Sequence, residues 1–181
     1  MTPLATVEDN APLRLFLALE LPEAVGQALV EWGRRELPGT RRVGEVHVTL
    51  AFLGGQPRTQ LEPILGILRE EAGRTRPFEL APQRYRETRS VGMLVLADPS
   101  GEATRLAGRL HERLEALGAY ERERRPWLPH VTVARFRERP RLAPRLPEIG
   151  SFVPSGAAAF LSRLRPSGAR YEVVESCSLA S

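Results

Sequence analysis

The sequence of 181 residues predicts an α+β fold, in which strands alternate with amphipathic helices. Runs rich in β-branched and aromatic residues indicate strands, and leucines repeated at helical spacing indicate helices that cover a sheet. A third observation concerns two of the three histidines, which stand in matching tetrapeptides at residues 47–50 (HVTL) and 130–133 (HVTV). Each tetrapeptide lies in a strand-like run, so the repeat connects the predicted strands to function.

The N-terminal part of the chain is predicted to run strand, helix, strand. A strand over residues 13–21 leads into a helix that begins at Pro22, because proline suits the first helical position. The helix ends near residue 36, where Leu37-Pro38-Gly39 breaks it. The first motif strand spans residues 46–53 (VHVTLAFL) and stops at a glycine pair.

The middle of the chain is predicted to hold two helices around two strands. Thr59 is expected to cap a helix that runs to about residue 72. Strands over residues 78–87 and 91–97 follow, and then a helix over residues 102–117. The apolar stripe of that helix consists of Leu106, Leu110, Leu114 and Leu117.

The C-terminal part begins with the second motif strand, residues 130–136 (HVTVARF). Residues 137–147 contain three prolines and are predicted to form an irregular crossover, with no domain boundary. A hairpin of residues 157–164 and 170–176 is expected to close the fold.

Strand periodicity gives the two motifs a chemical face. Because residues i and i+2 of a strand point the same way, His47 shares a face with Thr49, and His130 shares one with Thr132. Imidazole titrates at a pKa of about 6.5, so one copy can accept a proton while the other donates one. A threonine hydroxyl can donate to an anionic oxygen. The set suits a phosphodiester substrate.

A simpler interpretation is that a histidine on a strand satisfies a structural hydrogen bond, but the duplication favours catalysis. His111 has no threonine partner, and we expect it to be a solvated residue of the third helix. Arg135 follows the second motif, and strict alternation turns it away from His130. It reaches the same face only if the strand twists or bulges after Thr132.

The motif pair resembles the two-histidine phosphoesterase superfamily. Residues 13–25, 46–55, 129–136 and 168–173 resemble its RNA 2',3'-cyclic phosphodiesterase branch, also named 2'-5' RNA ligase, and the resemblance covers nearly the whole chain. It implies one domain over residues 1–181 with a bilobal, pseudo-symmetric fold, in which antiparallel sheets flanked by helices surround a central cleft. It also implies that His47 is the proton donor, that His130 is the proton acceptor, and that Thr49 and Thr132 bind substrate.

The implied activity is hydrolysis of RNA 2',3'-cyclic phosphate ends to 2'-phosphomonoesters without a metal or cofactor, with ATP-independent 2'-5' ligation as the reverse reaction. The implied partner is RNA that carries a cyclic phosphate or a 2'-5' linkage, tRNA fragments included. Two alternatives stay open: a catalytically silent RNA- or nucleotide-binding module, and a nucleic-acid-dependent scaffold with structural histidines. A His→Ala variant that folds and binds without turnover would favour the enzyme.

Composition agrees with that partner and excludes some chemistry. The net charge is +4 with a pI of about 10.1, and all 26 basic residues are arginine, so a lysine-containing phosphate loop or a lysyl adenylate is absent. No zinc-ligand spacing is found. The arginine-rich stretches at residues 84–89 and 122–125 are expected to be solvated loops, although Trp127 beside the second could stack a base.

One cysteine, Cys177, excludes an internal disulfide. The N-terminal residues lack the apolar segment of a signal peptide, and no run is long enough for a membrane span. We therefore expect a cytoplasmic enzyme. We also expect a monomer, although these residues do not bear on the oligomeric state.

Overall fold

A computed structural model describes residues 11–181, which form eight strands, three α-helices and one 3-10 helix. The elements in chain order are β1 (Leu13–Glu20), α1 (Glu23–Glu36), β2 (Arg41–Arg42), β3 (Val48–Gln56), η1 (Arg58–Gln60), α2 (Leu61–Arg74), β4 (Ala81–Glu87), β5 (Val91–Ala97), α3 (Glu102–Leu117), β6 (His130–Arg135), β7 (Gly156–Arg165) and β8 (Gly168–Cys177). The expectation that the N-terminus is no signal peptide concerns mainly residues 1–10, which lie outside the described range.

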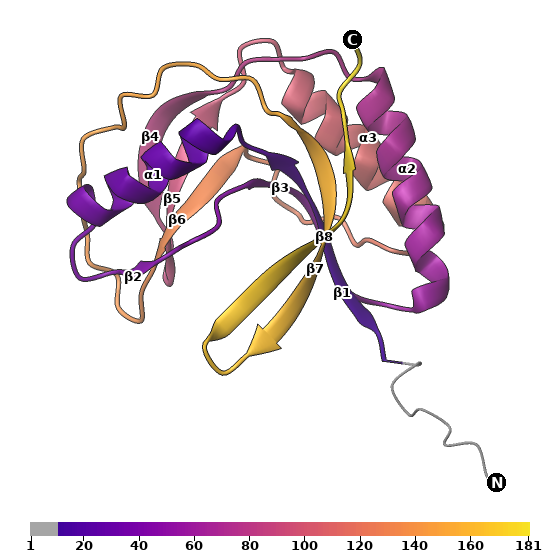
Figure 1. Cartoon of the computed structure of the whole chain (residues 1–181), viewed down its shortest axis with the longest axis horizontal. Helices are drawn as coiled ribbons and strands as arrows, with labels where there is room; N and C mark the ends of the chain where they lie inside the picture. Colours follow the sequence, from indigo (N-terminus) through magenta and orange to yellow (C-terminus); the bar gives the residue numbers. More distant parts are fainter. Residues whose placement is uncertain (1–10) are drawn as a thin grey trace, which may run out of the picture.

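The strands form one curled antiparallel sheet in the order β4-β5-β6-β3-β1-β7-β8, with β2 beside β6 (Figure 1). Between β3 and β6 the sheet is joined at the pair Val48–Val131. It therefore has two arms, one made of β2, β4, β5 and β6 and the other of β1, β3, β7 and β8. Each arm contributes one motif strand, which confirms the predicted α+β fold and its two-lobed arrangement.

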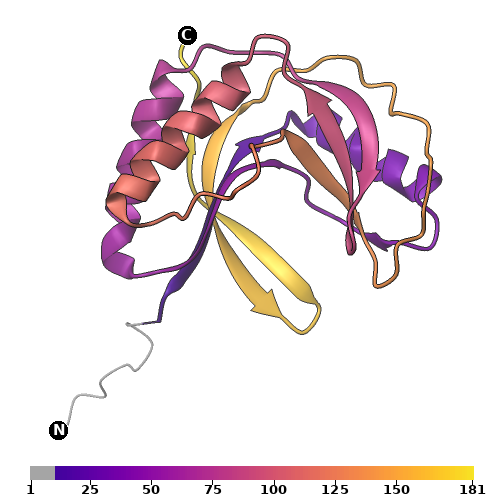
Figure 2. The same cartoon turned by 180° about the vertical axis from the view of Figure 1, so that it is seen from behind.

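The helices cover the outer faces of the two arms. α1 packs on β2 and β6, whereas α2 and α3 pack on each other and on β3, β7 and β8. Figure 2 shows α2 and α3 side by side at one end of the molecule and α1 at the other, with the β7–β8 hairpin projecting away from them. None of the helices in the described range has both the length and the apolarity to cross a bilayer.

The crossover between β6 and β7 is irregular, as predicted, and is fastened by buried polar groups. The Glu87 carboxylate accepts hydrogen bonds from the backbone N–H of Arg141 (2.9 Å) and of Leu142 (2.8 Å). The indole N–H of Trp32 donates to the Arg145 carbonyl at 2.8 Å. These bonds replace the strand pairing that the prolines of this segment prevent.

The predicted cap of α2 at Thr59 is wrong. Pro57 begins a 3-10 turn, in which the Gln60 N–H donates to the Pro57 carbonyl at 2.9 Å, so Thr59 is already helical. A capping residue needs an extended backbone. Gln60 precedes α2 instead and makes no side-chain capping bond.

The prediction that His111 is a solvated helix residue is also wrong. Its side chain is buried, it stacks on Tyr120 with ring centroids 4.6 Å apart, and its Nε2–H donates to the Leu50 carbonyl at 2.7 Å. His111 lies four residues after Ala107, on the buried side of α3. It therefore fastens α3 to the first motif strand and has a structural role.

Candidate active site

The two motifs face each other across the pair Val48–Val131, whose side chains are fully buried. Strands β3 and β6 are antiparallel, so extending this register by one residue each way places His47 opposite Thr132 and Thr49 opposite His130. Directly opposite side chains have Cβ atoms roughly 5 Å apart, and diagonal neighbours such as the two histidines roughly 7–8 Å. That spacing leaves room for a phosphoryl group between the imidazoles.

All four predicted site residues line one cleft of about 970 Å³. Its walls also carry six arginines and one carboxylate, Glu45, which makes the cleft strongly cationic. The arginines are Arg14, Arg41, Arg42, Arg135, Arg165 and Arg170. The sequence did not single out five of them, because each stands alone in the chain or in an ordinary pair and only the fold gathers them.

His130 is held in one tautomer by the backbone two residues before it. Its Nδ1 lies 2.8 Å from the Leu128 carbonyl, and because a carbonyl only accepts, Nδ1 must carry the proton. In the neutral ring the lone pair is then on Nε2. Nearby, the Trp127 indole N–H donates to the Thr49 carbonyl at 3.0 Å, so this indole joins the two motifs. Trp127 thus has a structural contact, and it does not line the cleft; the base-stacking role stays a prediction.

His47 lies in an aromatic box. Its ring stacks on Phe16 (centroids 4.9 Å apart) and on Phe160 (5.9 Å), and Tyr171 meets it edge-on at 5.5 Å. Burial, and secondarily the positive charges of His130 and Arg135, lowers the pKa of His47 to about 4. The ring is therefore neutral in the unliganded cleft near neutral pH.

The sequence prediction missed this box, although the apolar residues on both faces of β1 indicate a second buried surface. In the run Leu15 to Leu19 every residue is buried, yet Phe16 and Ala18 belong to a second apolar cluster with Ala158 and Phe160, apart from the main core. A strand that is buried on both faces must pack against other residues on each of its two apolar faces. The second surface of β1 lies under His47.

The sequence predicts that Arg135 reaches the face of His130 only if its strand twists or bulges after Thr132, and β6 does bulge there. Gly92 pairs with Ala134 and Met93 with Thr132, so Val133 is an extra residue without a partner on β5. A bulge reverses the alternation beyond it. Arg135 therefore returns to the face of His130, lines the cleft, and is close enough to lower the pKa of His47.

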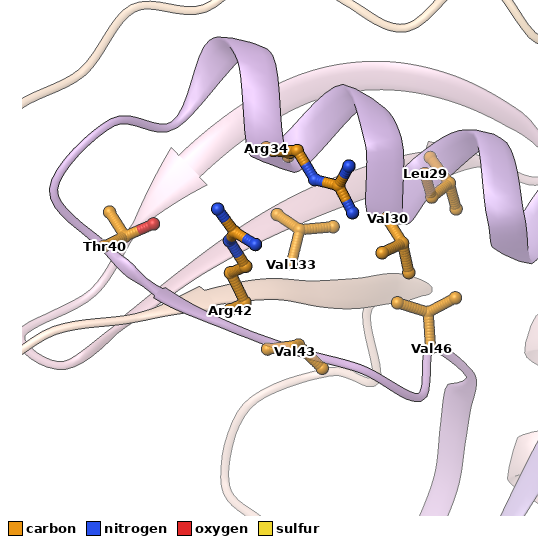
Figure 3. A pocket seen from close by; sticks show the side chains of 9 residues that line it. Leu29, Val30, Arg34, Thr40, Arg42, Val43, Val46 and Val133 are labelled. Atoms are coloured by element: carbon orange, nitrogen blue, oxygen red, sulfur yellow. The ribbon is translucent and has the colours of Figure 1, made fainter.

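The bulged Val133 points to the opposite side, toward α1. Figure 3 shows it between Val30 of α1 and the segment after β2, with the side chains of Arg34 and Arg42 nearby. The gap there measures only about 10 Å³, room for a single water. It is a packing defect behind the motif strand and offers no second ligand site.

The prediction of a solvated loop is wrong for residues 84–89, because residues 84–87 belong to β4 and Glu87 is buried. Neither this stretch nor residues 122–125 contributes a side chain to the lining of the cleft. Cys177 is a free cysteine. In residues 11–181 no three His, Cys, Asp or Glu side chains gather as a metal site would require.

Comparison with known proteins places the chain in a family. The model of the 2'-5' RNA ligase superfamily matches residues 21–165. An RNA 2',3'-cyclic phosphodiesterase of Thermus thermophilus is 35% identical over 182 aligned residues, covering 92% of this chain and 90% of the relative. A crystal structure of a Thermus thermophilus protein superposes with a TM-score of 0.79 at 32% identity, covering 92% of this chain and 98% of that one.

The apo crystal structure of Escherichia coli LigT superposes with a TM-score of 0.82, covering 94% of this chain and 99% of that one; at 22% identity it supports the fold alone. The family model spans most of the chain, and the relative from Thermus thermophilus matches it almost end to end. The chain belongs to the 2'-5' RNA ligase superfamily.

Proposed function

We propose that this protein is an RNA 2',3'-cyclic phosphodiesterase, which opens the terminal cyclic phosphate of RNA to a 2'-phosphomonoester. The observation that carries the proposal is the pairing of the two His-Thr motifs about Val48–Val131 inside a cleft lined by arginines. The activity named for the Thermus thermophilus relative supports it.

The reaction needs one proton acceptor and one proton donor on opposite sides of the phosphorus. Nε2 of neutral His130 takes a proton from water, and the water oxygen bonds to phosphorus while the bond from phosphorus to O3' breaks. Protonated His47 gives its proton to the departing O3'. The hydroxyls of Thr49 and Thr132 donate to the non-bridging oxygens, and Arg135 balances their charge.

Substrate binding must promote the protonation of His47, the proposed proton donor. Burial and two positive neighbours keep His47 neutral in the free cleft. A bound phosphodiester anion offsets the charge of Arg135 and favours the imidazolium form of His47. Protonation of His47 would therefore accompany substrate binding, and the aromatic box would shield the proton from bulk water.

The same pair can join a cyclic phosphate end to a 5'-hydroxyl when that hydroxyl takes the place of water. His130 takes its proton, its oxygen bonds to phosphorus while the bond from phosphorus to O3' breaks, and His47 protonates O3', which leaves a 2'-5' linkage without ATP. We further propose that the protein acts as a monomer on RNA fragments in the cytoplasm, tRNA fragments among them. Neither histidine role involves a metal or a cofactor.

The test uses a short RNA with a 2',3'-cyclic phosphate end, incubated with the protein in the presence of a chelator. Wild type should yield only the 2'-phosphate, and His47→Ala and His130→Ala should each lower the rate by about 10²- to 10⁴-fold. His111→Gln, which keeps a donor for the Leu50 carbonyl, is the matched histidine control and should retain turnover.

Circular dichroism and RNA binding are measured on every variant. If wild type binds the RNA and leaves the ring closed, the protein is a binding module and the proposed activity is wrong. If the 3'-phosphate forms instead, the bond from phosphorus to O2' has broken, and the assignment of O3' as the leaving oxygen is wrong.

A further inference from the structure

A second hollow, of about 760 Å³, adjoins the catalytic cleft at the ends of β2 and β6. Its charged walls are formed by Arg41, Arg135 and Arg137, with Glu138 as the one carboxylate and Ser90 as a hydroxyl. Arg41 and Arg135 line the cleft as well, so the two hollows meet at these two side chains. The proposed active site is therefore one end of a longer groove.

The two arginines at the junction are directly opposite each other in the sheet. Arg41 of β2 pairs with Arg135 of β6. Paired residues of antiparallel strands point to the same face, with Cβ atoms roughly 5 Å apart, and like charges in this arrangement destabilise the strand pair. An anion that binds between the two guanidinium groups would offset this repulsion.

No carboxylate within residues 11–181 supplies that anion. Ion pairs neutralise several arginines outside the groove; for example, Arg109 and Arg113 bind the buried Glu71, and Arg139 binds Glu87. None of the ion pairs among the described residues involves an arginine that lines the cleft or the second hollow. The arginines of the groove thus keep their charge available for a ligand.

The spacing along β6 places the junction beyond the reacting phosphate. Val131 marks the centre of the motif pair, and Arg135 lies four residues further along the strand. Four extended residues span roughly 13 Å, and the bulge at Val133 shortens this distance. One nucleotide and an arginine side chain together bridge such a gap. The next negative charge of an RNA chain is the phosphodiester on the 5' side of its terminal nucleotide.

We propose that Arg41 binds the phosphodiester that joins the terminal nucleotide to the one before it. The preceding nucleotide then lies in the second hollow, with Arg137 beside the following phosphate. Arg135, already placed at the reacting phosphate, stands between the two anions. The proposal rests on the proposed phosphodiesterase function, because the motif pair fixes the end from which the chain extends. It makes the groove selective for RNA ends over single cyclic nucleotides.

The experiment compares two dinucleotides that end in a 2',3'-cyclic phosphate. One has the ordinary phosphodiester linkage and the other an uncharged methylphosphonate linkage, and a 2'-O-methyl group on the first nucleoside keeps both linkages stable. Wild type should prefer the charged linkage in kcat/KM. Arg41→Gln should lower this preference by about tenfold, mostly through KM, because the contact acts in the ground state and the transition state alike. Arg41→Lys should keep part of it.

Arg76→Gln is the matched control, because Arg76 is exposed and lines neither hollow; it should keep the wild-type preference. Melting curves should show that Arg41→Gln is at least as stable as wild type, since it removes a repulsion from Arg135. Equal losses on both dinucleotides in Arg41→Gln, or a wild type that does not distinguish them, overturn the upstream site and leave the phosphodiesterase intact. A wild type that opens neither dinucleotide, nor a cyclic phosphate on longer RNA, contradicts the proposed function itself.

Arg137 tests the path of the chain through the second hollow. Arg137→Gln should lower the ratio of kcat/KM for a trinucleotide to that for a dinucleotide by up to about fivefold, as for an exposed ion pair. Raising the salt concentration should reduce the same ratio in wild type. A ratio that Arg137→Gln leaves at the wild-type value contradicts this path.

Discussion

Val48 of β3 pairs with Val131 of β6, and the proposed catalytic groups are arranged about these two valines as about a twofold axis. One half-turn exchanges His47 with His130 and Thr49 with Thr132. The buried valines hold the motif strands together on the core side, while the polar side chains line the cleft on the other. The site therefore has two equivalent imidazoles by topology, and their surroundings must distinguish them.

A substrate with sulfur in place of the bridging O3' separates the two proposed roles. A thiol titrates near pKa 8.5, far below an alcohol, so a 3'-thiolate leaves with little help from an acid. His47→Ala should regain most of its lost rate on this substrate, and His130→Ala should not, as measured by thiol release. Rescue of His130→Ala alone would exchange the two assignments.

The pH dependence should show the effect of the aromatic box. Catalysis needs one neutral histidine, and the pair becomes doubly protonated only when His47 gains a proton, at a pKa of about 4 in the free enzyme. We therefore expect kcat/KM to fall as the pH drops through about 4, and to be maintained above it on this limb.

Opening the box should move that limb. Tyr171→Ala removes the edge-on ring beside His47 and admits water, which reduces the burial that lowers the pKa. The acidic limb should shift upward, toward the ordinary histidine value, and the NMR titration of His47 should shift with it. The signal of His111 serves as the internal reference, since it lies on the far side of β3.

Arg135 should contribute through both its charge and its shape. Arg135→Ala should lower kcat/KM by about 10²-fold, the order seen when one transition-state donor is lost. Arg135→Lys should recover only part of this, because an ammonium cannot bind two oxygens in a plane. The pKa of His47 is measured in the same variants by NMR titration. Arg135→Ala should raise the pKa of His47, because it removes a repelling positive charge.

Glu87 offers a prediction about stability that is independent of catalysis. Its side chain is 2% exposed and accepts hydrogen bonds from the crossover backbone and from Arg139. Burial alone would raise the pKa of Glu87, but these bonds hold it below the usual value. Glu87→Gln should lower the free energy of unfolding by about 2–3 kcal/mol at neutral pH, as for a broken bond to a buried charge.

The sign of the pH effect follows from the lowered pKa. The stabilisation from Glu87 is present above the carboxyl pKa of the unfolded chain and is lost as the pH falls through the lower pKa of the folded state. Urea unfolding of wild type and Glu87→Gln should therefore converge in acid. Glu148→Gln, at an exposed glutamate of the same crossover, should match wild type throughout.

The sequence predicted the elements that follow from local periodicity, and it missed the contacts made across the sheet. The motif strands and the helices are recognisable because their apolar residues repeat every two or every three to four positions. His111 was mistaken because its partner, the Leu50 carbonyl, is supplied by a strand 61 residues away. Every residue has a backbone carbonyl, so the sequence does not show which one accepts a given hydrogen bond.

The bulge in β6 was foreseen only as a condition for Arg135. Its position depends on the neighbouring strand, where Gly92 faces Ala134 and any Cβ would collide with the ring of Tyr85. Nothing in the run HVTVAR itself shows that one residue has no partner. The aromatic box was missed for a similar reason, because Phe16, Phe160 and Tyr171 come from three strands that only the folded sheet brings to His47.

The aromatic box encloses only one of two otherwise equivalent motifs. A change within either motif would alter groups of the one cleft that both motifs line. Here the difference in proton affinity comes from rings on neighbouring strands, which can be exchanged one at a time while each His-x-Thr stays as it was. A difference in proton affinity between the two histidines can thus evolve through the residues around them. To redesign which histidine holds the proton, the residues to vary are those of the aromatic box.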